Sequence, residues 1–278
     1  MKPLRVAILV VLGGCAAPPQ PVVAPAQERL ADAGARGAAL ARAGDNAAAA
    51  LGFQEALRIA RTIEDADAIA VHAINLSIVY QRLGHTAAAR SALGVVLDDE
   101  RRRFPETRLV QARLRQAILD LAQGDAPAAA RHAGTAREQC ERIGCEHAAA
   151  ILNVQAAAAL QGGDAQQSLT LALAAESAAR RRDERAETAN ALRNAGRARA
   201  ALGDAGSAIA ALEQALEIDR ALADPRKILA DLDELARANS LRGDAEAARH
   251  YAERARVIRQ AAGEGATGVG ESAVRLSR

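Results

Sequence analysis

The chain has 278 residues, enough for one large domain or two ordinary ones, and half of its residues are hydrophobic. Only 1% of the residues are aromatic and tryptophan is absent, so a core must be built mainly from alanine and leucine, which favours helices. The formal charge of +2 is supplied by Lys2 and Arg5 near the N-terminus, and the rest of the chain is formally neutral. Charge therefore gives no support for binding nucleic acid or an anionic membrane.

The first fifteen residues have the pattern of an export signal. A basic start precedes an apolar run over 6–12, which is too short to span a bilayer, since that takes about 20 residues. The run ends at Leu12-Gly13-Gly14-Cys15 and resembles the signal peptide of bacterial lipoproteins. This resemblance implies that residues 1–14 are removed and that Cys15 is acylated. By the same resemblance, Ala16 implies an outer-membrane lipoprotein facing the periplasm. The alternatives are an ordinary secretory signal or a short membrane anchor.

Two segments flank the central part of the chain. Residues 15–27 contain four prolines and are expected to form an extended linker, at about 3.1 Å per residue. Residues 263–278 are rich in glycine and are expected to form a flexible tail. The folded domain is therefore predicted over 28–262.

A glycine followed by Asp or His recurs through this domain at a nearly constant spacing of 39 or 40 residues: Gly44, Gly84, Gly124, Gly163, Gly203 and Gly243. Such a period is typical of a stack of identical supersecondary units. Glycine can adopt the left-handed conformation that ends one helix, and a following Asp can cap the next helix. Each unit is therefore predicted to be two helices joined at the glycine.

The unit at 192–224 carries the clearest pattern. Small residues occupy three places where its two helices must approach closely, namely Gly196, Ala208 and Ala215. Together with the Gly203-Asp204 turn, they resemble a tetratricopeptide repeat (TPR). The 40-residue length is similar to the extended repeats of kinesin light chains and of bacterial peptide-sensing regulators. The resemblance implies an all-α, right-handed, TPR-like α-solenoid of about six helix-turn-helix repeats.

This register predicts where the helices lie. The first helices of the six units are expected near 28–43, 67–83, 107–123, 147–162, 185–202 and 226–242. The second helices are expected to end near Glu64, Arg102, Ile143, Arg182, Ala223 and Ala262. Pro105 and Pro225 fit the joins between units, because a helix rarely continues through proline.

Two cysteines, Cys140 and Cys145, lie beyond the leader. Export to an oxidising compartment would permit a disulfide between them if the chain turns at Gly144, because a straight helix would hold them too far apart. The alternative is two small buried thiols. The spacing of these cysteines from His132 and His147 matches no metal-binding motif, so no metal or cofactor is predicted.

The sequence contains no nucleophile elbow or phosphate-binding loop, so an enzyme is not predicted. In TPR proteins the first helices line a concave groove, and the resemblance implies that polar residues on these helices face it. Eight of them are the candidate contacts for a protein or peptide: Asn75, Arg82, Arg115, Asn153, Asn190, Arg193, Asn194 and Arg197. An Asn amide can both donate to and accept from a peptide backbone, and Arg offers a planar fork for a carboxylate. The alternative is a polar face that contacts only water.

The sequence thus favours a non-enzymatic scaffold or adaptor in the periplasm, anchored to the outer membrane through its lipid alone. It would bind an envelope protein or an extended peptide in the groove, and no nucleic acid. Resemblance to TPR lipoproteins implies a role in envelope, secretion or pilus assembly. A receptor for a small secreted peptide and a purely structural spacer are the alternatives.

Overall fold

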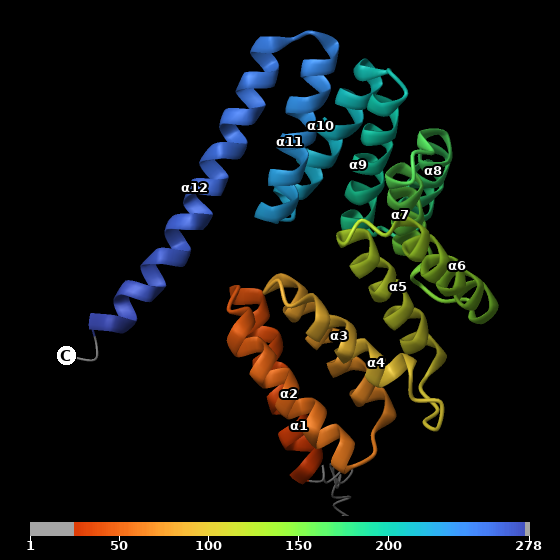
Figure 1. The fold of residues 1–278 in the computed structure, drawn as a ribbon, viewed down its shortest axis with the longest axis vertical. Helices are drawn as coiled ribbons and strands as arrows, with labels where there is room; N and C mark the ends of the chain where they lie inside the picture. The colour runs from red at the N-terminus through yellow and green to blue at the C-terminus, as the bar shows by residue number, and fades with distance from the viewer. Residues whose placement is uncertain (1–24, 276–278) are drawn as a thin grey trace, which may run out of the picture.

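The computed structural model describes residues 25–275, and their side chains as far as residue 261. This part of the chain forms twelve α-helices and no strand (Figure 1). The helices are α1 (Pro25–Ala43), α2 (Asn46–Thr62), α3 (Ala66–Arg82), α4 (Thr86–Leu97), α5 (Glu106–Ala122), α6 (Ala126–Ile143), α7 (Ala148–Gln161), α8 (Ala165–Arg181), α9 (Arg185–Ala201), α10 (Ala205–Ala221), α11 (Pro225–Arg242) and α12 (Ala245–Arg275). The signal peptide, Cys15 and the linker up to residue 24 lie outside the described residues.

The helices form six pairs, and each pair is joined at one of the six turn glycines. All six glycines have a left-handed φ, from 76° at Gly84 to 91° at Gly163. The following Asp caps the second helix in five pairs, as where Asp204 accepts a hydrogen bond from the Ser207 N–H at 3.0 Å. His85 makes no side-chain cap. These turns confirm the six-repeat register and the all-α solenoid.

Successive pairs stack side by side along a curved path from α1 to α12 (Figure 1). We call α1, α3, α5, α7, α9 and α11 the first helices. Neighbouring first helices from α3 to α11 contact one another, so they share one side of the stack. The close approach within the fifth pair depends on small residues, since Ala208 and Ala215 are completely buried and Gly196 is buried as well. Among the described residues, no helix combines the length and apolar character needed to cross a bilayer.

The end of α4 corrects the sequence prediction. This helix stops at Leu97, well before the predicted end at Arg102. Asp99 explains the early stop, because its carboxylate accepts hydrogen bonds from the backbone N–H groups of Arg101 and Arg102 at 3.1 and 3.2 Å. Such local side-chain bonds compete with helix, and an acidic side chain is unfavourable at a helix C-terminus. The joint at 98–105 is instead held to the core by the buried Phe104.

Both outer boundaries of the domain also differ from the prediction. Helix α1 begins at Pro25, inside the predicted linker, because proline at the first helical position lacks only an N–H that would have no partner there. Helix α12 continues to Arg275, whereas a flexible tail was predicted from residue 263. Its glycines lower helix propensity by about 1 kcal/mol each relative to alanine, but glycine keeps its N–H and does not break the helix as proline would.

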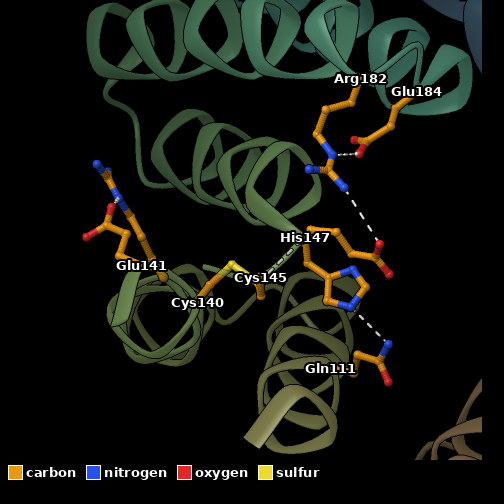
Figure 2. Close-up of a disulfide and its surroundings, with 9 residues drawn as sticks. Gln111, Cys140, Glu141, Cys145, His147, Arg182 and Glu184 are labelled. Atoms are coloured by element: carbon orange, nitrogen blue, oxygen red, sulfur yellow. Dashed lines mark hydrogen bonds and ion pairs between the residues drawn. A yellow bond between two sulfur atoms is a disulfide. The ribbon is translucent and has the colours of Figure 1, made fainter. Parts of the chain in front are cut away.

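The join between the third and fourth pairs contains a disulfide between Cys140 and Cys145 (Figure 2). Gly144 ends α6 in a left-handed conformation, with φ of 65°, and turns the chain so that the two Cα atoms lie 4.8 Å apart. Just beyond, the His147 ring lies 2.9 Å from the side-chain nitrogen of Gln111 on α5 (Figure 2). The disulfide therefore closes the turn that leads into α7.

Three other joins use the same left-handed turn without glycine. Glu64, Asp183 and Ala223 have φ values of 56°, 55° and 53°. Residues other than glycine are strained in the left-handed backbone conformation, by roughly 1–2 kcal/mol per residue. These joins therefore reduce the stability of the stack.

Candidate functional site

A cavity of about 350 Å³ opens on the side of the stack formed by the first helices α5, α7, α9 and α11. We call it the first-helix cavity. Its apolar lining is Leu114, Ile118, Leu121, Ala150, Val154, Ala157 and Ala230, and its polar lining is Asn153, Glu187, Asn190, Arg193, Asn194, Arg197 and Lys227. The fold thus brings five of the eight predicted residues into one place and sets them beside an aliphatic surface.

Arg193 lines the cavity, and its guanidinium is engaged by other groups of the protein. Its side chain is only 10% exposed, and its Nε lies 2.5 Å from a carboxylate oxygen of Asp231 on α11. The same guanidinium pairs with Asp219 on α10 and donates to the Asn190 side-chain oxygen at 3.0 Å. Burial raises the pKa of Asp231 to about 6, although Arg193 opposes this shift. Arg193 therefore joins three helices at the wall of the cavity.

Asn153 and Asn194 also serve the packing of helices, because both are more than nine-tenths buried. The Asn194 side-chain amide donates to the backbone oxygen of Asn153 at 3.0 Å, which ties α9 to α7. The Asn153 amide donates to the backbone oxygen of Glu187 at 3.0 Å and to its carboxylate at 2.7 Å. These two residues line the cavity and position Glu187, and their role as ligand contacts stays a prediction.

Asn190 lies between two charged groups of opposite sign. Its amide nitrogen is 3.2 Å from the Glu187 carboxylate, and its oxygen accepts a hydrogen bond from Lys227 Nζ at 2.7 Å. Among residues 25–261, neither Glu187 nor Lys227 has an ion-pair partner within 4 Å. Burial lowers the pKa of Lys227, and the charge of Arg193 lowers it further. Because neither charge is neutralised by an ion pair within these residues, both are available to a ligand.

Sequence reasoning missed both of these charged residues. Lys227 is the only lysine besides Lys2, and that rarity was a signal that could have drawn attention to it. Glu187 lies three residues before Asn190 on α9, so it shares a helix face with the predicted cluster. Arg197, which was predicted, pairs with Glu234 of α11 at 3.2 Å at the edge of the cavity.

The other three predicted residues lie apart from the cavity, on α3 and α5. Arg115 donates to the backbone oxygen of Ser77 at 3.3 Å, and burial lowers its pKa to about 10, with a further contribution from the nearby charge of Arg82. Arg82 donates to the backbone oxygen of Ala41 at 3.3 Å, and its own pKa is lowered by burial and then by Arg226. Within the described residues, neither arginine pairs with a carboxylate. Asn75 is half-buried on α3.

No protein-family model matches the chain, and no curated protein matches its sequence. Several solved structures match its fold. A Rap protein complexed with Competence and Sporulation Factor has a TM-score of 0.65 and 14% identity, over 84% of this chain and 77% of that one. PilF of Pseudomonas aeruginosa has a TM-score of 0.55 and 12% identity, over 82% of this chain and 91% of that one.

A third match is a signal transduction ATPase with a tetratricopeptide repeat sensor from Pyrococcus horikoshii. Its TM-score is 0.59 and its identity 16%, and the match covers 76% of this chain but only 32% of that longer protein. At such identities the likeness concerns the fold. The six glycine-turned helix pairs and these matches together show that the chain has the TPR-like α-solenoid fold.

Proposed function

We propose that the protein is a non-enzymatic adaptor that binds a protein or an extended peptide along its first helices. The observation that carries this proposal is the first-helix cavity, where aliphatic side chains lie beside an amide and two charges that have no ion-pair partner among residues 25–261. Binding sites for peptides combine apolar contact area with a few placed polar groups. The concave surface of a solenoid is also where such repeat proteins bind their partners.

We place this adaptor in the bacterial envelope, attached to the outer membrane through a lipid on Cys15. The support is the leader that ends at Cys15, together with the Cys140–Cys145 disulfide, because disulfides persist in oxidising compartments. The solved PilF structure has a similar fold, and a role in envelope, secretion or pilus assembly is proposed on that likeness and on the leader.

The lipid attachment has its own test. Globomycin blocks the peptidase that processes lipoproteins, so an uncleaved precursor should accumulate in treated cells. A Cys15→Ser variant should in addition leave the membrane fraction. Normal processing under globomycin would contradict the lipoprotein assignment.

The adaptor function is tested by capture of partners from solubilised envelope, using the full chain as bait. The test variant combines Glu187→Gln, Asn190→Ala and Lys227→Gln, which remove the two charges and the amide that lies between them. The matched control combines Arg131→Gln and Glu138→Gln, which lie exposed on α6. A partner captured by the wild type and the control but lost by the test variant would support the proposal. A partner retained by all three would place binding elsewhere.

A receptor for a small secreted peptide is the second candidate function. The specific observation that favours it is the size of the cavity, since 350 Å³ is near the lower end of the range of roughly 300–1,000 Å³ for small-ligand sites. The Rap structure, with a similar fold, was solved in complex with Competence and Sporulation Factor.

A further inference from the structure

We infer that the first-helix cavity recognises a short aliphatic peptide with both termini free, whose ammonium group binds Glu187 and whose carboxylate binds Lys227. This inference rests on the second candidate function, a receptor for a small peptide, and deepens it, because it names the class of ligand that the same cavity takes. It follows from three features of the cavity: two opposite charges, an aliphatic floor and a small volume.

The two charges lie on opposite sides of one side chain. The Asn190 amide donates to the Glu187 carboxylate at 3.2 Å and accepts from Lys227 Nζ at 2.7 Å, so it holds the two groups in place. The two groups do not form an ion pair with each other, and within the described residues no other opposite charge lies within 4 Å of either. A partly buried charge without a partner is costly, and a ligand with two complementary charges would remove that cost at both ends.

Both charged side chains are held in place by hydrogen bonds to neighbouring polar groups. The Asn153 amide fixes the Glu187 carboxylate at 2.7 Å, and the Asn194 amide fixes Asn153 in turn. On the other side, Arg193 donates to the Asn190 oxygen at 3.0 Å and is itself held by buried carboxylates. Side chains that are already ordered lose little entropy when a ligand binds, which favours selectivity for the geometry of the ligand.

The apolar lining of the cavity determines which side chains of a ligand fit it. Leu114, Ile118, Leu121 and Val154 form an aliphatic floor without aromatic residues. An extended chain spans at most about 3.3–3.6 Å per residue, so a volume of 350 Å³ fits only a few residues. A long unstructured segment would place its termini outside the cavity and leave both charges unpaired. A short peptide with aliphatic side chains can contact the aliphatic floor with those side chains and pair with both charges through its termini.

Isothermal titration of the full chain with the tripeptide Leu-Ala-Leu tests the inference. Four forms are compared: free, N-acetylated, C-amidated and blocked at both ends. The free form should bind the wild type best, and each single block should weaken binding about tenfold, which corresponds to 1.4 kcal/mol. In Glu187→Gln, N-acetylation should no longer matter while amidation still does. In Lys227→Gln the pattern should be reversed, and Lys227→Arg should restore the preference for a free carboxylate.

Controls keep the result unambiguous. Glu138→Gln and Arg131→Gln change the same charges on the exposed face of α6 and should bind like the wild type. All variants are first compared by circular dichroism, and the conservative Lys227→Arg variant keeps the charge where the neutral variant fails to fold. Equal binding of all four peptide forms, or free leucine binding as tightly as the tripeptide, would overturn the inference. If no form binds but envelope capture still depends on Glu187 and Lys227, the inference fails and the adaptor function stands.

Discussion

Gly196 of α9 and Leu212 of α10 are packed so closely that position 196 has no room for a side chain. A Cβ atom built on Gly196 would lie 2.6 Å from Leu212 Cγ and 3.1 Å from the backbone oxygen of Ala208. The second of these atoms belongs to a helix backbone and cannot move independently. The contact fixes the distance between the two helices that carry the repeat pattern.

We expect Gly196→Ala to lower the free energy of unfolding, because overpacking costs about 1–3 kcal/mol and outweighs the gain of about 1 kcal/mol in helix propensity. Gly134 on α6 is the matched control, since a Cβ there would meet nothing within 4 Å. Gly134→Ala should therefore raise stability by up to about 1 kcal/mol. Urea denaturation measures both variants. Shifts of the same sign would contradict the packing assigned to Gly196.

The left-handed turns give a second pair of substitutions with opposite expected effects on stability. Ala223 has φ of 53°, and Gly203 has φ of 85° with open space around its Cα. Ala223→Gly should stabilise the protein by about 0.5–1 kcal/mol, because the relief of strain exceeds the added entropy of the unfolded chain. Gly203→Ala should destabilise it by about 1 kcal/mol. Thermal unfolding compared at one pH tests both, and a loss of stability in Ala223→Gly would disprove the reasoning.

Arg193 provides a prediction about the buried ion network. Arg193→Met would leave Asp219 and Asp231 buried without a cation, and we expect a loss of about 3–5 kcal/mol at pH 7. Arg131→Met, on an exposed surface, should change stability by less than about 0.5 kcal/mol. Urea unfolding of the two variants makes the comparison.

The expected pH dependence of the stability of Arg193→Met follows from the buried carboxyl group of Asp231. Burial raises the folded-state pKa of Asp231 to about 6, above the value of about 3.9 in the unfolded chain. Between these values the folded state binds more protons, so its stability rises as pH falls. Without the arginine the pKa of Asp231 should rise further, because Arg193 opposes the effect of burial, and the deficit of the variant should shrink from pH 7 to pH 5. A deficit that is independent of pH would show that the lost interaction is not electrostatic.

For the buried His72 we expect a pH dependence of folding stability opposite in sign to that contributed by Asp231. The ring is buried against Phe53, its Nδ1 has no hydrogen-bond partner in the part of the chain that the structure describes, and burial lowers its pKa. Below the unfolded-state pKa of about 6.5, the unfolded chain therefore binds more protons than the folded one, and stability falls with pH until the folded-state pKa is passed. His72→Gln cannot titrate and should lose this part of the slope. Parallel slopes for both proteins between pH 7 and 5 would contradict it.

The repeat register could be predicted from the sequence because it depends on local chemistry. A left-handed turn needs Gly203, a cap needs Asp204, and a close helix contact needs Gly196, so each requirement leaves its own residue in the chain. The end of α4 could not be predicted in this way. Asp99 favours a turn through its own side chain, and an apolar pattern does not reveal that competition.

The site was only partly predictable, because the role of a polar side chain depends on the groups that it contacts in the fold. Arg193 and Asn194 carry the pattern of groove residues, yet Asp219 and Asp231 bind the first and Asn153 binds the second. Those partners come from other helices, and a single sequence does not say which carboxylate will face which guanidinium. The same limit hid Lys227, whose place beside Asn190 depends on the stacking of α11 on α9.

The joint at 98–105 separates the first two repeats from the repeats that line the first-helix cavity. Arg101 and Arg103 are exposed there and lie outside any helix, so brief trypsin digestion should cut the chain between α4 and α5. In a solenoid each repeat relies on its neighbours alone, so both fragments should keep their helices. The larger fragment would retain the whole first-helix cavity, since α5, α7, α9 and α11 supply every residue that lines it. Binding of Leu-Ala-Leu to the purified larger fragment would then show that the first-helix cavity recognises its ligand without the first two repeats.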